Sequence, residues 1–243
     1  MHDADSLTLQ CLQNQGADAL AIIDENSYQL PPLNAQVLTN RFDIAQKHPG
    51  ALFNDFDFSV EPLPKYWVFR ISKEKSINLH IIQQATLYGA TLQLIGFKNE
   101  GFNSLIKPLK TQGLVELERH KNQLFYATVL PNSALGLITE TGYHSLQWQN
   151  LAVGFYSKPG CFGWNKIDKA SQWLMDELQQ TLDTSSINNC LDLGSGYGYL
   201  SIRAKLMGIK QIDATDNCAA ALLTCEANFA HYGIEGQVIA GNI

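Results

Sequence analysis

The glycine-rich stretch over residues 190–217 constrains the fold of this chain more than any other part of the sequence. An apolar run over 190–193 predicts a buried strand. Alternating glycines follow it, and then a helical pattern of apolar residues that ends at Gly208. A second strand over 211–215 leads directly to an aspartate. This order predicts a strand–loop–helix–strand unit, which is the repeating element of α/β folds.

The ends of these two strands carry the residues from which we expect a ligand site. Glycines have no Cβ and let the backbone approach a ligand closely, and the start of the helix offers free N–H groups. A carboxylate about 20 residues beyond such a loop can accept hydrogen bonds from two ribose hydroxyls. The site is therefore predicted to hold an adenosine-containing cofactor. Its first candidate residues are Gly194, Gly196, Gly198 and Asp216.

The spacing of the glycines separates two kinds of adenosine cofactor. The dinucleotide fingerprint is G-x-G-x-x-G, whereas the third glycine here comes one position earlier. Asp192 lies two positions before the first glycine, where a carboxylate would repel a pyrophosphate but could serve an ammonium group. S-adenosylmethionine has an ammonium group and no phosphate, so the sequence favours it. A nicotinamide-dependent oxidoreductase and a glycine-rich turn in another doubly wound protein are the alternatives.

Composition sets the class of protein. The 243 residues suffice for one large domain or two small ones, and a net charge of −6 argues against indiscriminate nucleic-acid binding. Five cysteines without metal-ligand spacing indicate reduced thiols in a cytoplasmic protein, with no metal site. No signal-peptide pattern is visible, and no apolar run approaches the ~20 residues of a membrane span. The sequence does not specify an oligomeric state.

The first half of the chain predicts alternating strands and helices. We expect strands over 19–23, 51–58, 65–71 and 91–96, helices over 7–14, 34–46, 72–88 and 103–111, and a hairpin of 114–119 with 123–129. Ser72 is the expected cap of its helix and Gly89 its end. The first strand, which ends at Asp24, is not followed by a glycine-rich loop.

The D-x-G-x-G-x-G pattern from Asp192 to Gly198 resembles motif I of the class I S-adenosylmethionine-dependent methyltransferases. The element order of the first half also resembles the second half of such a domain. The resemblance implies an α/β fold with two Rossmann-like class I methyltransferase sheets in tandem. Residues 1–145 would be a degenerate methyltransferase-like domain, inferred from element order alone. Residues 146–243 would be the N-terminal, incomplete part of the cofactor-binding catalytic domain.

The aromatic segment 155–164 and the expected helix over 168–182 narrow the resemblance. A Pro-Gly-x-Phe run, followed by Asp168 and Ser171, resembles the ribosomal RNA small-subunit guanine-N2 methyltransferase family. That resemblance implies methyl transfer from S-adenosylmethionine to the exocyclic amine of a guanine in 16S rRNA. The implied partner is 16S rRNA or the small ribosomal subunit. The chain departs from the family at Ala170 and at Gly163-Trp164, which concerns substrate contact rather than cofactor binding. Asp168 is first of all the expected cap of its helix.

The motif and the resemblance together give the expected site. Asn217 is a candidate cap for the next helix, and Asn242 would lie near the adenine amino group. The expected cofactor-binding residues are Asp192, Gly194, Ser195, Gly196, Gly198, Asp216, Asn217 and Asn242. No catalytic residue is expected, because the Asn-Pro-Pro-Phe/Tyr tetrapeptide with which the family holds the amine does not occur in the chain. We therefore expect a fragment that does not catalyse methyl transfer alone.

RNA contact is a weaker prediction from the basic and aromatic residues. The candidate basic residues are Lys65, Arg70, Lys73 and Lys75 in the first half and Lys158, Lys166 and Lys169 in the second. Phe162 and Trp164 could stack on an unpaired base or belong to the core. The six histidines are expected to be solvated or buried, and Cys190, Cys218 and Cys225 to be buried beside the sheet. A non-catalytic RNA-binding or assembly module is the remaining alternative.

Overall fold

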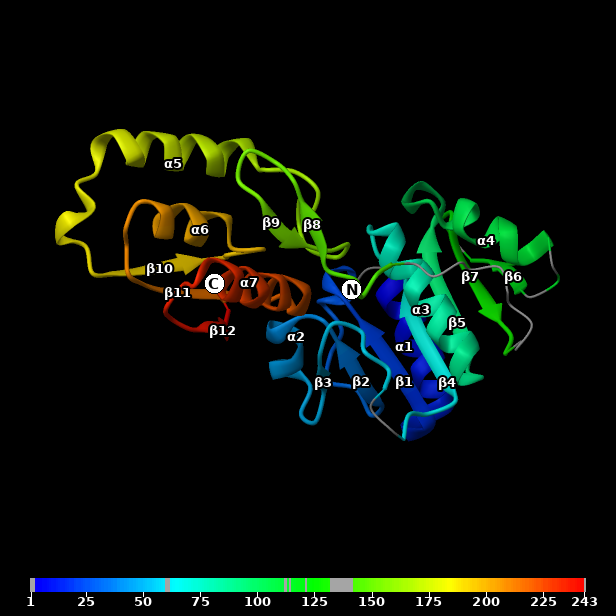
Figure 1. Cartoon of the computed structure of the whole chain (residues 1–243). Coiled ribbons are helices and arrows are strands. Elements are labelled where there is room, and N and C mark those ends of the chain that lie inside the picture. The colour runs from blue at the N-terminus through cyan, green and yellow to red at the C-terminus, as the bar shows by residue number, and fades with distance from the viewer. Residues whose placement is uncertain are drawn as a thin grey trace. The chain divides into compact units, whose positions relative to one another are not determined.

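The chain folds into two compact units, which are described separately (Figure 1). The structure is a computed structural model that describes residues 3–59, 62–111, 113, 115–120, 122–131 and 142–242. Unit 1 spans Met1–Thr141 and unit 2 spans Gly142–Ile243. Among the described residues, no helix combines the length and apolar character needed to cross a membrane.

Unit 1 is built on a mixed sheet with the order β3-β2-β1-β4-β5-β7-β6. Its described strands are β1 (Ala19–Ile23), β2 (Gln36–Thr39), β3 (Leu52–Phe53), β4 (Tyr66–Arg70), β5 (Thr91–Phe97), β6 (Val115–Arg119) and β7 (Leu124–Val129). The first five are parallel, and β7 pairs antiparallel with both β5 and β6. The strand order reverses between β1 and β4, which is where doubly wound folds bind ligands.

Helices cover this sheet and share its apolar core. They are α1 (Asp3–Gln15), α2 (Phe42–Lys47), α3 (Lys75–Tyr88) and α4 (Phe102–Thr111), with 3-10 turns at Gly16–Asp18, Glu25–Ser27 and Lys98–Glu100. Gly89 ends α3 at φ 69°, as predicted, because a left-handed residue favours glycine. The helix begins at Lys75 with Glu74 as its N-cap, so the prediction of Ser72 as the cap was wrong. The Ser72 hydroxyl instead accepts a hydrogen bond from the Glu74 N–H at 3.2 Å.

Two other predictions in unit 1 were wrong or too long. The segment 34–46, predicted as one helix, forms β2 and then the short α2, because Val37 and Leu38 pair with the parallel strand β1. The strand predicted over 51–58 is limited to β3. After it the Asn54 side chain accepts from the Asp57 N–H at 2.9 Å and donates to the Asp57 carbonyl at 3.0 Å, which turns the chain.

Unit 2 has a three-stranded parallel sheet of order β10-β11-β12 and a separate hairpin. The described elements are β8 (Gln147–Gln149), β9 (Phe155–Ser157), α5 (Lys169–Thr181), a 3-10 turn (Thr184–Ser186), β10 (Asn189–Leu193), α6 (Tyr199–Leu206), β11 (Gln211–Asp216), α7 (Ala219–Tyr232) and β12 (Val238–Ala240). The order β10-β11-β12 matches β1-β2-β3 of unit 1, with parallel neighbours in both. The succession of β10, α6 and β11 confirms the predicted strand–loop–helix–strand unit.

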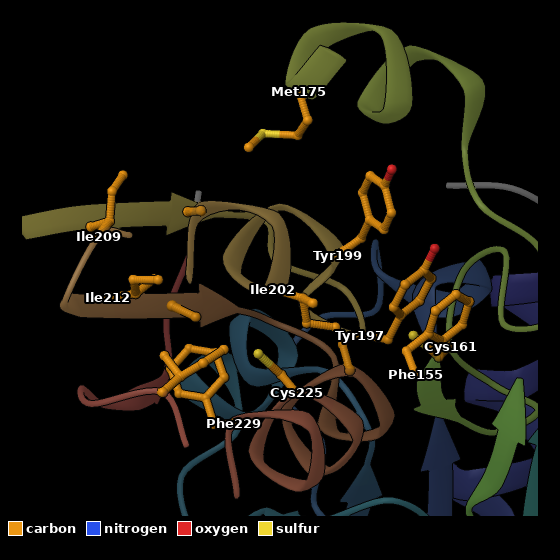
Figure 2. Close-up of a cluster of buried hydrophobic side chains, with 14 of the residues drawn as sticks. Phe155, Cys161, Met175, Tyr197, Tyr199, Ile202, Ile209, Ile212, Cys225 and Phe229 are labelled. Carbon is orange, nitrogen blue, oxygen red and sulfur yellow. The ribbon is translucent and has the colours of Figure 1, made fainter. Parts of the chain in front are cut away.

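The core of unit 2 lies between the sheet and its helices (Figure 2). Ile202 and Ile212 meet Cys225 and Phe229 of α7 in this cluster. The prediction that the first strand is buried was wrong, because Leu191 and Leu193 of β10 are 60% and 59% exposed. Strand β10 ends the described sheet, so it has a strand neighbour on one side only.

The helix predicted over 168–182 is present as α5. Met175 is its buried residue, whereas Trp173, Leu174 and Leu182 are exposed. Met175 and Leu178 contact the cluster that contains Tyr199 of α6. An apolar groove of about 250 Å³ lies between α5, β10 and α6.

Candidate functional site

The glycine loop joins β10 to α6 in a tight turn of left-handed residues. Gly194, Gly196 and Gly198 have φ angles of 70°, 54° and 85°, which residues with a Cβ rarely adopt. The N–H groups of Gly194 and Ser195 both donate to the Thr215 carbonyl, at 2.9 and 3.0 Å. The Gly198 N–H donates to the Ser195 carbonyl at 2.8 Å. The loop is thus tied to the end of β11.

Two of these glycines differ in the space around them. A Cβ on Gly198 would lie 2.9 Å from the Cys225 sulfur on α7, so this position is closed by packing. A Cβ on Gly196 would meet no atom within 4 Å, so this position is open. Open backbone at a helix start is where a ligand can approach N–H groups.

Asp216 connects the glycine loop to the next strand. Its Oδ2 accepts a hydrogen bond from the Gly196 N–H at 2.9 Å, and its Oδ1 accepts from the Cys218 N–H at 2.9 Å. An ionised carboxylate has about four acceptor positions, so capacity remains for the two hydroxyls of a ribose. The prediction that Asn217 caps α7 was wrong: Cys218 is the N-cap residue, and no side chain caps the helix.

Asp192 is buried at the base of the same loop, with 4% of its surface exposed. Its Oδ2 accepts from the Ser201 N–H at 3.1 Å and from the Ser201 hydroxyl at 2.6 Å. Its Oδ1 has no hydrogen-bond partner among the described residues. Burial raises the pKa of Asp192, and the Ser201 hydrogen bonds only partly offset this. Ser201, which the sequence did not single out, orients this carboxylate.

The third strand brings the last predicted residue to the same edge of the sheet. The Gly241 N–H donates to the Asp216 backbone carbonyl at 3.0 Å, so Asn242 follows directly beside β11. A Cβ on Gly241 would lie 2.4 Å from the Thr215 hydroxyl oxygen, which explains a glycine before Asn242. The predicted residues from β10, β11 and β12 thus meet at the carboxyl ends of parallel strands, where α/β sheets bind ligands.

The aromatic segment before α5 is attached to the glycine loop. The Phe155 and Tyr197 rings lie against each other (Figure 2) and stack with 4.0 Å between their centroids. The Tyr197 hydroxyl donates to the Lys166 carbonyl at 3.0 Å. The side-chain oxygen of Asn228 on α7 accepts a hydrogen bond from the Tyr156 N–H at 2.7 Å. Its side-chain nitrogen donates to the Tyr156 carbonyl at 2.8 Å and to the Tyr197 carbonyl at 2.7 Å. No local pattern in the sequence marked Asn228 for this role.

The helix cap predicted for α5 is confirmed. The Asp168 carboxylate accepts from the Ser171 N–H at 3.0 Å and from the Ser171 hydroxyl at 3.2 Å. The hydrogen bond from the Ser171 N–H lowers the pKa of Asp168. Both residues therefore serve the helix start.

Two residues predicted to contact RNA, Lys158 and Arg70, are buried. Lys158 is only 1% exposed; its Nζ lies 3.6 Å from the centroid of the Tyr143 ring and donates to the Pro159 carbonyl at 3.1 Å. Arg70 is buried and forms ion pairs with Asp5 and Glu100. Both cations therefore have internal partners, which their positions in the sequence did not indicate. Phe162 is exposed, whereas Trp164 packs against the core of unit 2.

The other candidate groups do not form a reactive centre in the described part of the chain. All five cysteines are thiols outside disulfides, and Cys225 is buried, whereas Cys190 and Cys218 are half-buried. Burial raises the pKa of Cys161 and of Cys225 to about 12, so neither thiol is reactive at neutral pH. Among the described residues, no group of three or more His, Cys, Asp or Glu side chains is arranged to hold a metal ion.

Comparison with known proteins shows what the chain, and the part that holds the site, are similar to. Residues 152–243 match the family described as "Methyltransferase small domain". Several curated relatives are named "Ribosomal RNA small subunit methyltransferase C". One, from Pasteurella multocida, is 26% identical over 230 residues, covering 91% of this chain and 67% of the relative. Another, from Buchnera aphidicola, is 33% identical over 211 residues, covering 80% of this chain and 56% of the relative.

A relative from Acinetobacter baylyi is 26% identical over 191 residues, covering 74% of this chain and 55% of the relative. The chain thus spans about half the length of most of these curated relatives. A solved structure of the T. thermophilus 16S rRNA N2 G1207 methyltransferase, in complex with AdoMet and guanosine, covers the whole chain with a TM-score of 0.77. The chain covers 70% of that structure at 18% identity, so the likeness establishes the fold: α/β, of the class I methyltransferase type.

Proposed function

We propose that this chain, whose residues 152–243 match the methyltransferase small domain, is part of a 16S rRNA guanine-N2 methyltransferase and binds S-adenosylmethionine at its glycine loop. The observation that carries the proposal is the hydrogen bond from the Gly196 N–H to Asp216, which joins the loop to the acidic strand end. The curated relatives that carry this name support the substrate class, and we place the protein in the cytoplasm on the same basis.

The residues present fit the proposed cofactor. In the proposed arrangement, Asp216 accepts the ribose hydroxyls, and the open backbone at Gly196 lies against the adenosine. The buried Oδ1 of Asp192 serves the ammonium group of the methionine end, directly or through water, because it lacks another partner in the described structure. Asn242 would accept from the adenine amino group.

The proposed reaction in the whole protein is a direct methyl transfer. S-adenosylmethionine supplies a methyl group already activated by its sulfonium. The exocyclic amine of a splayed-out guanine would form the new N–C bond as the S–CH3 bond breaks, with release of S-adenosylhomocysteine and of one amine proton, so catalysis is mainly a matter of positioning. The Asn-Pro-Pro-Phe/Tyr tetrapeptide that would hold the amine does not occur in these 243 residues. The part we propose for this chain is therefore to bind and orient the cofactor.

Calorimetric titration of the chain with S-adenosylhomocysteine tests the proposal. We expect saturable one-to-one binding that weakens at least tenfold in Asp216→Ala, since hydrogen bonds to a charged group contribute about 1.5–3 kcal/mol each. Asp216→Asn keeps one acceptor oxygen and should lose less. Glu226→Gln removes the same charge from an exposed position on α7 and should bind normally. Preferential binding of NADH, or unchanged binding by Asp216→Ala, would contradict the proposal.

A further inference from the structure

Unit 1 contains a polar hollow at the position where doubly wound folds bind ligands. Its volume is about 480 Å³, within the roughly 300–1,000 Å³ of small-molecule sites. Its walls come from the residues that follow β1, from Arg41 after β2 and from Arg70 at the end of β4. The strand order reverses between β1 and β4, so the hollow lies at the topological switch point of this sheet.

The walls of this hollow are held in place by internal bonds. The Arg70 guanidinium donates to the Asn26 carbonyl and, at 3.1 Å, to Glu100. The Asn26 side chain donates to the Ile71 carbonyl at 2.9 Å, and the Asn26 N–H donates to Asp24 at 2.9 Å. The loop after β1 is thus fixed against β4 before any ligand binds, which lowers the entropic cost of binding.

Two deeply buried side chains of the wall keep unused hydrogen-bonding atoms. Asp5 and Arg70 are 2% and 9% exposed. Asp5 Oδ1, which lies 3.6 Å from an Arg70 nitrogen, and Arg70 Nε have no hydrogen-bond partner among the described residues. Buried polar atoms without partners are costly, and a ligand or water that satisfies them is favoured. The Asp5 oxygen is an acceptor, and the Arg70 nitrogen is a donor.

We propose that this hollow binds a guanine base, free or in single-stranded RNA. Guanine presents adjacent donors, N1–H and N2–H2, that suit a carboxylate, and adjacent acceptors, O6 and N7, that suit an arginine fork. The hollow offers Glu25 and Asp5 for the first edge and Arg41 for the second. Tyr28 adds a ring for stacking. The Lys47 ammonium lies 3.0 Å from the centroid of that ring, and the base is placed on the opposite face.

The charges of the hollow disfavour two other ligand classes. Three carboxylates, from Asp5, Glu25 and Asp43, outnumber the two guanidinium groups, which repels an isolated phosphate. S-adenosylmethionine would need the close backbone approach that a glycine loop provides, and the chain after Asp24 has none. This proposal concerns unit 1 alone and does not depend on cofactor binding in unit 2.

The test follows the amide NMR signals of residues 25–29 of the chain during titration with guanosine. We expect these signals to shift with saturation, and inosine, which lacks the 2-amino group, to bind at least fivefold more weakly. Arg41→Gln should weaken guanosine binding at least tenfold, and Arg41→Lys, which keeps the charge but loses the fork, should weaken it less. Lys110→Gln removes one positive charge from an exposed site on α4 and should bind normally.

A second arm compares free and RNA-bound guanine. A seven-residue oligouridine with one central guanosine should shift the same signals, and the all-uridine oligomer should not. Guanosine shifts confined to unit 2, equal binding of guanosine and inosine, or normal binding by Arg41→Gln would each overturn the proposal. Asp216→Ala should leave these shifts unchanged, so failure of the cofactor site and failure of this site are distinguishable.

Discussion

At the residue scale, Asp24 is a buried acid whose charged form reduces the stability of unit 1. It follows β1, is almost completely buried, and accepts the Asn26 N–H at 2.9 Å. Burial, and then the charge of Glu25, raises the pKa of Asp24 to about 7, although the Asn26 N–H and Arg70 oppose this. The raised pKa means that the folded state favours the neutral carboxyl group, which an asparagine imitates.

Asp24→Asn should therefore change stability in a pH-dependent manner. Below the unfolded-state pKa of about 3.9, Asp24 is neutral in both states and the folded wild-type protein has its full stability. As the pH rises from there through the folded-state pKa of about 7, the unfolded state loses its proton first and the free energy of unfolding falls. The variant does not titrate there, so it should gain on the order of 2 kcal/mol over wild type between pH 5 and pH 8. Urea unfolding of unit 1 at several pH values measures this difference.

The exposed Asp18 provides the control for this prediction. Asp18→Asn removes the same charge from the surface and should change the free energy of unfolding by less than about 0.5 kcal/mol. An Asp24→Asn effect that stays constant from pH 5 to pH 8 would contradict the assigned cause, because only titration in the folded state makes the effect depend on pH.

Some side chains with local partners were predictable from the sequence, whereas those with distant partners were not. Asp168 caps a helix whose first turn lies beside it, and Gly89 ends a helix through its own φ angle. The burial of Lys158 depends on the Tyr143 ring, and the role of Asn228 depends on Tyr156, 72 residues away. No local pattern contains those contacts.

At the element scale, the glycine loop combines two constraints that substitution can separate. Gly198→Ala places a Cβ 2.9 Å from the Cys225 sulfur at φ 85°, and we expect it to destabilise unit 2 by about 2 kcal/mol or more. Gly196→Ala puts a Cβ on a left-handed residue but brings it into contact with no atom, so it should lower the stability of unit 2 by about 1–2 kcal/mol. Chemical unfolding of each variant gives these values.

A double-mutant cycle identifies the contact. Gly198→Ala combined with Cys225→Ala should recover the steric part of the loss and leave the φ penalty, so the two effects should not be additive. Additive effects would mean that the Cys225 sulfur does not restrict this position. Gly196→Ala combined with Cys225→Ala is the matched control and should be additive.

Elements with their own signals were predicted correctly, and elements defined by pairing were not. Strand β4 and the hairpin of β6 with β7 have strong local patterns, and both are present. The segment 34–46 has helical spacing, but its residues Val37 and Leu38 gain more by extending the parallel sheet beside β1. Similarly, the apolar pattern of β10 does not reveal that its leucines are exposed at the end of the described sheet.

At the scale of the whole molecule, the two units repeat one arrangement at different extents. Unit 1 has the order β3-β2-β1-β4-β5-β7-β6, and unit 2 repeats its first three strands as β12-β11-β10. This repetition supports our proposal that residues 1–145 derive from a methyltransferase-like domain that lost its glycine loop. The core cluster around β1 and the cluster of Figure 2 each consist of residues from one unit only.

Separate cores predict separate unfolding transitions, which the four tryptophans can report. Trp67 is buried in unit 1, where it stacks on Phe58 at 4.6 Å between centroids, and the other three belong to unit 2. In a variant with Trp148, Trp164 and Trp173 changed to phenylalanine, fluorescence reports on unit 1, and in Trp67→Phe it reports on unit 2.

S-adenosylhomocysteine at about 100 times its Kd should stabilise unit 2 by about 2.7 kcal/mol and leave the unit 1 transition unchanged. Asp216→Ala should abolish that gain. Equal stabilisation of both transitions would show instead that the units unfold together or that the cofactor binds outside the glycine loop, because a ligand stabilises only the cooperative unit that holds it.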